Sequence, residues 1–292
     1  APEIRNDPAA MARIEWGGRH VRNQLLSMPF KPGQTALAAV PNLERILFHY
    51  YYDGAFNDFW AMEVLDNKSR WDRFADIPCV LSTGWYDLFT EEATQQFAEL
   101  ARRKASQMKL IVGPWNHTAM RGGGSVVGEV DFGQDAAWGY ARYNTERLRW
   151  FDRWLRGIDT GVEDDPPVRL FTMGGGDGTL SAPKASGAGV FGTGIAAKGY
   201  LNHGGHWRSE ADWPLSRATQ TPFYLHAGNR LSTEAPPETA GSVSWTHDPE
   251  HPVPTLGASV APFLEFVPLP KGISPDYLST RGRMTTFTYD GP

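Results

Sequence analysis

The chain has 292 residues, of which 41% are hydrophobic and 21% charged, and it carries a formal net charge of -5 at pH 7. This composition is typical of a soluble globular protein and excludes a disordered or fibrous chain. The sequence has no marked block of Lys and Arg and no apolar run near the roughly 20 residues of a membrane helix, so we expect neither nucleic acid nor a membrane as a partner.

The single cysteine, Cys79, excludes an internal disulfide and a zinc site built on paired thiolates. The first residues, 1–7, lack the basic stretch and apolar core of a signal peptide, so we expect a cytoplasmic protein. This opening nevertheless resembles the middle of a protein, and the sequence leaves open a leader further upstream.

Residues 1–72 are expected to form a mainly helical segment. Asp7 followed by Pro8 predicts the start of a first helix, since such a pair supplies the N-cap and the first-turn proline. A second helix is predicted after Asn42 and a third after Asn57, because apolar residues follow each at helical spacing.

Residues 73–160 alternate between strands and helices. Apolar runs at 77–82 and 108–112 predict buried strands of a parallel sheet, and the amphipathic stretch 90–104 predicts the helix that connects them. A longer helix is predicted over 140–157. Alternation of this kind indicates an α/β fold.

Residues 161–292 change to short strands separated by turns rich in Gly, Pro and Asp. Alternating apolar residues recur at four places, namely 168–172, 223–225, 243–245 and 287–289. This pattern favours an antiparallel β-sandwich or jelly roll. The stretch 174–199 is rich in Gly, Ala and Ser and is interpreted as a long connection.

Two side chains suited to acid–base chemistry follow the two predicted strands. Asp87 lies a few residues beyond the first strand, and His117 a few beyond the second. Because the carboxyl ends of parallel strands meet at one edge of a sheet, where ligands bind, we expect both side chains there. A carboxylate beside an imidazole holds it in the tautomer that accepts a proton from a hydroxyl nucleophile. The spacing alone equally fits a turn aspartate and a structural histidine.

Longer blocks of sequence favour the catalytic interpretation. They include Gly-Trp-Tyr-Asp ending at Asp87 and Gly-Pro-Trp-Asn-His ending at His117. The full set is 84–87, 113–117, 151–157, 166–168, 201–208, 213–214 and 248–257. Together, and in this order, the blocks resemble the CocE/NonD hydrolases, a family that includes cocaine esterase and X-prolyl dipeptidyl-peptidases.

The resemblance implies a partial α/β-hydrolase sheet with a helical cap at 1–72, the C-terminal part of the hydrolase domain at 73–160, and an incomplete jelly-roll domain at 161–292. It implies that Asp87 and His117 serve a Ser-His-Asp triad that cleaves ester or amide substrates, X-Pro dipeptidyl ones included, with no metal or other cofactor. The family's serine precedes the cap, on a Gly-x-Ser-Tyr-x-Gly elbow. We therefore expect the nucleophile outside this chain, which alone would be inactive.

Other reactive residues favour structural roles. Ser125 lies in a Gly-x-Ser-x-x-Gly segment, but it follows three glycines and lacks the strand and helix that an elbow requires. Cys79 lies inside a predicted buried strand, where a thiol acts as a small hydrophobe. His203 and His206 lack a nearby carboxylate or thiolate that would complete a metal site.

Aromatic side chains near the predicted dyad could line an acyl pocket or fill the core. The candidates for substrate binding are Phe56, Trp60, Trp85 and Tyr86. Asp53 and Asp58 could meet a substrate amine, although helix capping is the preferred interpretation for both.

A different class of function is a non-catalytic fragment or subunit whose jelly roll serves as a binding or assembly module. A sheet without its upstream strands exposes an unpaired edge. We therefore expect a macromolecular partner, which is either the N-terminal portion that carries the nucleophile or another copy of the chain in a homo-oligomer. The small-molecule partner is expected to be an ester or an amide.

Overall fold

The computed structural model describes residues 4–20, 29–117, 125–127, 130–180, 200–237, 241–242, 244, 246 and 288–289. The chain divides into two compact units, Ala1–Arg73 and Phe74–Pro292. None of the helices in the described ranges has the length and apolar character needed to cross a bilayer.

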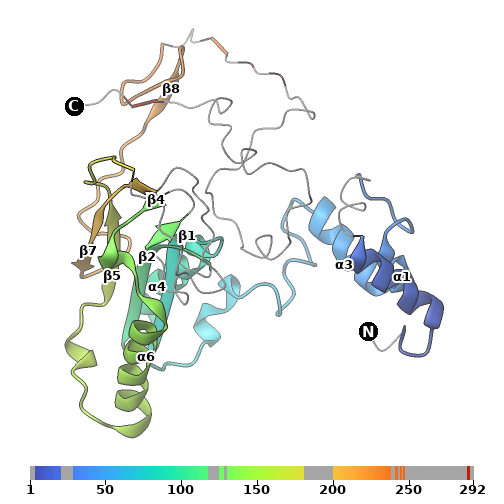
Figure 1. Cartoon of the computed structure of the whole chain (residues 1–292), viewed down its shortest axis with the longest axis horizontal. Coiled ribbons are helices and arrows are strands. Elements are labelled where there is room, and N and C mark those ends of the chain that lie inside the picture. The colour runs from blue at the N-terminus through green and yellow to red at the C-terminus, as the bar shows by residue number, and fades with distance from the viewer. Residues whose placement is uncertain are drawn as a thin grey trace. The chain divides into compact units, whose positions relative to one another are not determined.

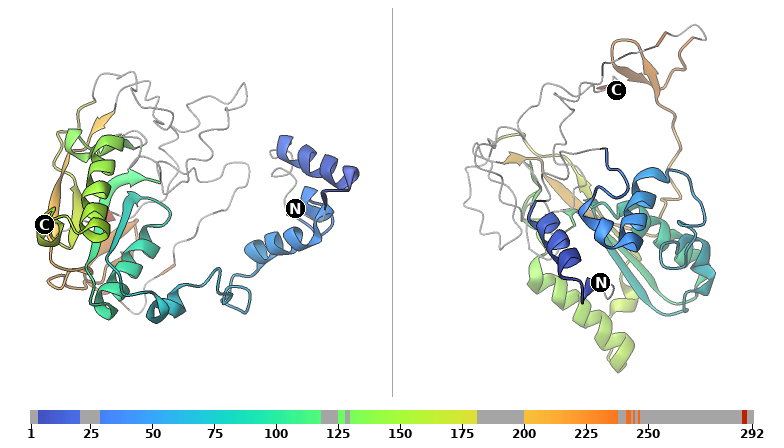
Figure 2. Two further views of the ribbon diagram at one scale, coloured as in Figure 1. Left: turned by 90° about the horizontal axis from the view of Figure 1, so that it is seen from below. Right: turned by 90° about the vertical axis from the view of Figure 1, so that its right-hand side faces the viewer.

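The N-terminal unit is built on helices α1 (Pro8–Arg19) and α3 (Pro41–Tyr52), drawn in blue in Figure 2. Helix α1 begins where the sequence predicts, because the Asp7 carboxylate accepts hydrogen bonds from the N–H groups of Ala9 and Ala10 at 3.0 Å. Short 3-10 helices, η2 and η3, cover Ala36–Ala39 and Lys68–Arg73. The core of this unit consists of Ile4, Ala10 and Val40, with Ile14 and Ala39 packed against them.

The third helix predicted after Asn57 does not form, and residues 58–65 are turns instead. The Asn57 side chain does accept from the N–H groups of Phe59 and Trp60, as an N-cap would. One helical turn closes when the Ala61 N–H donates to the Asn57 carbonyl, but the indole of Trp60 donates back to the Asp53 carbonyl. Asn57 therefore makes the predicted capping contacts, but the helix that it begins ends within one turn.

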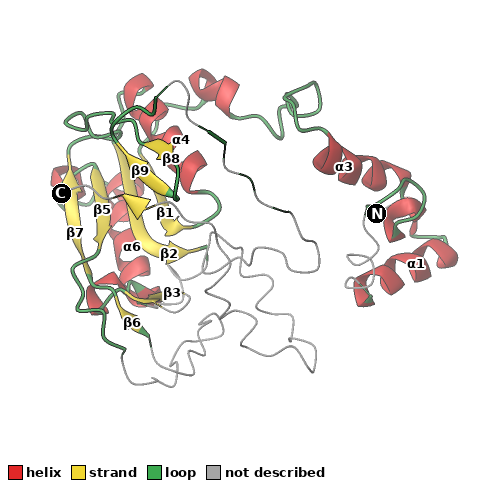
Figure 3. Cartoon of the chain, turned by 90° about the horizontal axis from the view of Figure 1, so that it is seen from above, coloured by secondary structure: helices red, strands yellow, loops and turns green. Residues whose placement is uncertain are grey.

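The C-terminal unit contains a mixed four-stranded sheet in the order β1-β2-β5-β7 (Figure 1). Its strands are β1 (Cys79–Tyr86), β2 (Met108–Asn116), β5 (Val168–Met173) and β7 (Gly205–Glu210). Strand β2 pairs in parallel with both β1 and β5, whereas β7 is antiparallel to β5. Figure 3 shows these strands side by side as yellow arrows. A mixed sheet combined with helices confirms the α/β class.

Helices α4 (Thr90–Arg103) and α6 (Gly139–Arg156) cover opposite faces of this sheet. Met108 lines a cavity together with residues of α4, whereas its neighbour Lys109 lines a cavity together with residues of α6. Successive side chains of a strand point to opposite faces, which places one helix on each side. Helix α4 follows the predicted range to within a residue, and α6 ends at Gly157, whose φ of 68° provides the expected left-handed cap.

Strand β5 forms where the apolar alternation predicts a strand, and it pairs in parallel with β2 and antiparallel with β7. It extends the sheet of β1 and β2, with Ile111 opposite Arg169. Val168, Leu170 and Phe171 are all buried, so β5 has the burial of an interior strand. The division into segments at residues 72 and 160 remains a prediction.

The remaining strands are short. Strands β3 (Val126–Val127), β4 (Val130–Asp131) and β6 (Leu201–Asn202) form one small sheet, and β8 (Tyr224–His226), β9 (Arg230–Ser232) and β10 (Thr288–Tyr289) form another. Val243 and Trp245, on which the predicted strand at 243–245 rests, and most of the predicted connection at 174–199 lie outside the described residues.

Aromatic side chains form the core at the carboxyl ends of the strands. One cluster contains Ile111, Trp115 and Trp138, with Tyr143 and Trp207 packed against it. A second contains Phe132, Ala136 and Phe171, with Tyr86, Val130 and Trp207. Trp207 belongs to both clusters and joins them into one aromatic layer.

A partly buried ion network fastens α6 to the sheet. Lys109 of β2, only 5% exposed, pairs with Asp165, which also receives two hydrogen bonds from Arg149 of α6 at 2.6 and 2.9 Å. Burial on its own would raise the pKa of Asp165, but the hydrogen bonds from Arg149 and Lys109 outweigh it and hold the pKa below its ordinary value. The carboxylate is thus the shared partner of two cations.

Candidate active site

The two motif turns are set side by side by a close approach of β1 and β2. Gly84 lies opposite Gly113, and a β-bulge follows before Tyr86 pairs with Asn116. A Cβ atom on Gly84 would lie 2.0 Å from the carbonyl oxygen of Trp115, and one on Gly113 would lie 2.4 Å from the Trp115 ring. Both positions therefore require glycine, because any side chain would collide with Trp115.

Asp87 and His117 are in contact at the ends of these strands. The Nδ1 atom of His117 lies 3.2 Å from Oδ2 and 3.3 Å from Oδ1 of Asp87, a separation close to the long limit of a hydrogen bond. The Asp87 side chain is 11% exposed and that of His117 is 33% exposed. An ionised carboxylate can only accept, so Nδ1 donates and Nε2 carries the lone pair of the neutral ring. The arrangement suits proton transfer at Nε2.

Residues just after Asp87 hold this carboxylate and the turn that carries it. The backbone N–H of Phe89 donates to Oδ1 of Asp87 at 2.9 Å, and the Phe89 ring meets the His117 ring edge-on, with centroids 5.3 Å apart. The Thr90 hydroxyl lies 2.5 and 2.6 Å from the carbonyl oxygens of Gly84 and Asp87. Sequence reasoning missed Phe89 and Thr90. Their only signal was their position at the start of a predicted helix directly after the motif.

Trp85 and Tyr86, the candidate pocket residues of β1, make contacts within the fold. The indole of Trp85 donates to the Phe171 carbonyl at 2.7 Å, and its ring lies 6.1 Å from that of Trp213. Tyr86 packs against Phe132, and burial raises the pKa of its hydroxyl. These contacts tie the end of β1 to β5 and to the aromatic core. A role for either residue in substrate binding remains a prediction.

Phe56 and Trp60, the other two pocket candidates, belong to the N-terminal unit. Phe56 is 72% exposed, and the Trp60 indole is bonded to the Asp53 carbonyl at 2.8 Å. The Asp53 carboxylate accepts hydrogen bonds from Asn57 and His49, at 2.9 and 2.6 Å, and these bonds lower its pKa. Asp53 therefore has local partners, and substrate contacts by Phe56 and Trp60 remain predictions.

Two family models match the chain in succession. The X-Pro dipeptidyl-peptidase (S15 family) model matches residues 12–119, and the model of the X-Pro dipeptidyl-peptidase C-terminal non-catalytic domain matches residues 160–289. Cocaine esterase from Rhodococcus sp. (strain MB1 Bresler) is 30% identical over 240 residues, which are 77% of this chain and 35% of the esterase. The chain belongs to the CocE/NonD hydrolase family.

The chain spans about one third of the length of that esterase. The solved structure of a CocE/NonD family hydrolase from Staphylococcus aureus is also similar, with 17% identity and a TM-score of 0.38, over 68% of this chain and 28% of the other.

Ser125 does not lie on a nucleophile elbow of the CocE/NonD type. It is followed by the two-residue strand β3, which forms a hairpin with β4, and its carbonyl accepts from the Phe132 N–H at 2.8 Å. An elbow requires a helix directly after the serine. The structure thus agrees with a structural role for Ser125.

Cys79, His203 and His206 lie in surroundings that agree with structural roles. Cys79 opens β1, and burial raises the pKa of its thiol. His203 lies between β6 and β7 with its ring 5.2 Å from Phe132, and His206 lies in β7 opposite Thr172. Within the described ranges, no group of three or more His, Cys, Asp or Glu side chains is arranged to hold a metal ion.

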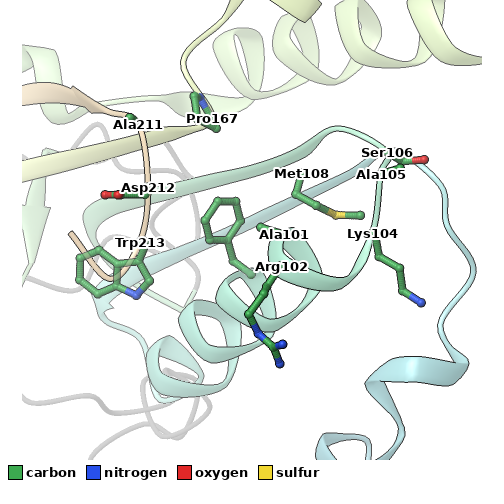
Figure 4. Close-up of a pocket in the computed structure, with 11 residues that line it drawn as sticks. Ala101, Arg102, Lys104, Ala105, Ser106, Met108, Pro167, Ala211, Asp212 and Trp213 are labelled. Atoms are coloured by element: carbon green, nitrogen blue, oxygen red, sulfur yellow. The ribbon is translucent and has the colours of Figure 1, made fainter. Parts of the chain in front are cut away.

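A cavity of about 440 Å³ lies away from the dyad, between the C-terminal half of α4 and the start of β2 (Figure 4). Its lining includes Arg102, Lys104, Met108, Asp212 and Trp213. Met108 is the first residue of β2, and His117 follows its last, so the nine-residue strand separates this cavity from the imidazole. This cavity is not the site of the dyad.

Proposed function

We propose that Asp87 and His117 are the acid and the base of a Ser-His-Asp triad that hydrolyses an ester or an amide, with the serine supplied from outside this chain. The observation that carries this proposal is the contact between Nδ1 of His117 and the Asp87 carboxylate at the ends of adjacent parallel strands. The names of the relatives, an esterase and an X-Pro dipeptidyl-peptidase family, suggest acyl esters and X-Pro peptides as substrates.

In the proposed reaction the serine hydroxyl attacks the substrate carbonyl while Nε2 of His117 takes its proton. The imidazolium then gives that proton to the leaving alcohol or amine, which leaves an acyl-enzyme. Water attacks the acyl group with the same base, and the acid is released. Asp87 orients the ring through Nδ1 and stabilises its charged form. The chemistry requires no metal and no organic cofactor.

The unpaired edge of β1 could bind the segment that carries the proposed serine. Within the described residues β1 pairs only with β2 and so lies at the edge of its sheet. Val80, which is 36% exposed, and Phe151 of α6 line a cavity of about 270 Å³ beside this strand. An unpaired strand next to apolar surface is a template for another strand. We propose that the preceding segment of the enzyme pairs here.

For residues 161–292 we propose a jelly roll, preceded by a cap at 1–72 and the end of the hydrolase domain at 73–160. The match of residues 160–289 to a C-terminal non-catalytic domain supports this assignment. It also favours the second candidate function, in which this chain contributes a binding or assembly module to a larger complex. The native mass separates a monomer of this chain from a homo-oligomer or a hetero-complex.

The deciding experiment uses the enzyme with its upstream region and a chromogenic acyl ester. A fluorophosphonate probe should label a serine outside the present sequence, and His117→Ala should abolish both turnover and labelling. Ser125→Ala is the matched control and should leave both unchanged. Labelling of Ser125, or turnover by residues 1–292 alone, would refute the division of the triad proposed here.

A further inference from the structure

Two arginines converge on one tryptophan at the start of α6. The guanidinium carbon of Arg142 lies 5.2 Å from the centre of the Trp138 ring, and that of Arg169 lies 6.0 Å from it. Arg169 also lies 5.3 Å from the Trp207 ring. Tryptophan faces attract cations, which explains how two like charges are tolerated around one ring. The rings do not neutralise them.

Neither guanidinium has an oxygen partner in the part of the chain that the structure describes. The nearby carboxylates are engaged elsewhere, since Asp165 is shared by Lys109 and Arg149 and the Glu146 carboxylate lies 3.8 Å from Arg149. Arg169 is half-buried, and burial together with the neighbouring Arg142 lowers its pKa. Glu146 and Asp165 act on the pKa of Arg169 in the opposite direction, but neither carboxylate is hydrogen-bonded to it, and a half-buried arginine without a hydrogen-bonded anion is costly.

Trp138 itself and the start of α6 offer further donors. Trp138 is 4% exposed, and its indole N–H has no acceptor among the described residues. Helix α6 has no side-chain N-cap and no acidic residue in its first turn. Trp138 has right-handed helical backbone angles and Gly139 has a φ of 59°, and a right-handed residue followed by one with positive φ is typical of turns whose N–H groups bind anions.

We propose that Arg142, Arg169 and the Trp138 indole bind a small oxyanion, a carboxylate or a phosphate, at the start of α6. The anion would accept hydrogen bonds from the two guanidinium groups and the indole, and it would complement the positive end of the helix. The site does not depend on the Asp87–His117 dyad, so it can be tested independently of the hydrolase proposal.

The test is an NMR titration of the full 292-residue chain, observed at the indole N–H of Trp138 and assigned with Trp138→Phe. Inorganic phosphate and acetate are added in separate series, with chloride keeping the ionic strength constant. A saturable shift is expected, and Arg142→Gln or Arg169→Gln should weaken the apparent Kd about tenfold. Tighter binding of phosphate indicates a phosphorylated ligand, and tighter binding of acetate a carboxylate ligand.

Arg147→Gln is the matched control, because Arg147 lies on the same helix but stacks on Tyr143. It should leave the Kd unchanged. If Arg169→Gln does not fold, the comparison of Arg142→Gln with Arg147→Gln still decides. A linear, non-saturating response, or an equal loss of affinity in Arg147→Gln, would overturn the proposal.

Discussion

The Nδ1 atom of His117 lies 3.2 Å from Oδ2 of Asp87, and the other oxygen of the same carboxylate is held at 2.9 Å by the backbone N–H of Phe89. The carboxylate is thereby oriented by the turn on which it lies and is not free to follow the imidazole. Its orientation fixes which nitrogen of His117 bears the proton.

Asp87→Asn should lower kcat of the complete enzyme by about four orders of magnitude, because an amide at this position can hold the imidazole in the wrong tautomer. The fold should be retained, since Asn keeps the acceptor for the Phe89 N–H. Ester turnover and thermal melting, measured on the same preparation, check both parts. A variant with near-normal turnover would remove Asp87 from the mechanism.

Thr90→Val should disturb the dyad without unfolding the protein. The hydroxyl bonds to the carbonyls of Gly84 and Asp87, and its loss should cost about 1 kcal/mol and loosen the turn. Thr94→Val is the control, because among the described residues the Thr94 hydroxyl bonds to the carbonyls of Thr90 and Glu91, both within α4. The imidazole NMR signals of His117 should move in the first variant and not in the second. Equal shifts in both would argue against a specific role of Thr90.

Gly84→Ala should destabilise the C-terminal unit by about 3 kcal/mol or more, since the new methyl group would lie 2.0 Å from the Trp115 carbonyl oxygen. Gly54→Ala provides the comparison, because its Cβ would meet no atom within 4 Å. Urea unfolding of the two variants measures the difference. A midpoint for Gly84→Ala close to that of Gly54→Ala would contradict the packing described here.

Asp165→Asn should cost about 3 kcal/mol, because it leaves Lys109 and Arg149 without their shared anion. The lowered pKa of Asp165 also predicts the pH dependence. Its stabilising contribution is complete above the ordinary carboxyl value of about 3.9 and is lost as the pH falls through the depressed value. Unfolding measured at pH 7 and at pH 3 checks both statements. Asp164→Asn, at an exposed position in the same loop, should change little at either pH.

Local patterns predicted the elements that position the dyad. The amphipathic stretch at 90–104 became α4, with acidic residues in its first turn and basic residues in its last, because the helix stripe and dipole are properties of neighbouring residues. The contact between Asp87 and His117 was expected from the strand, helix, strand order alone, since a right-handed crossover returns the chain to the same sheet edge.

The pairing of strands far apart in the chain could not be predicted from the sequence. The alternation in β5 fits either sheet, and only the register of Ile111 with Arg169 shows which one it joins. The same holds for Trp85, whose indole acceptor, the Phe171 carbonyl, lies 86 positions away. The sequence does not distinguish an aromatic side chain that lines a pocket from one that holds two strands together. Their hydrogen-bond partners distinguish them.

The close approach of Gly84 to Trp115 has a consequence for protein engineering. Gly84 of β1 has no side chain, and the backbone of Trp115 in β2 occupies the space that a side chain would need. The two turns are therefore a single mechanical unit, although thirty positions separate the aspartate from the histidine. A chimaera that takes only one of the two turns from a homologue will pack poorly where β1 meets β2. Both turns must be exchanged together to transplant the dyad.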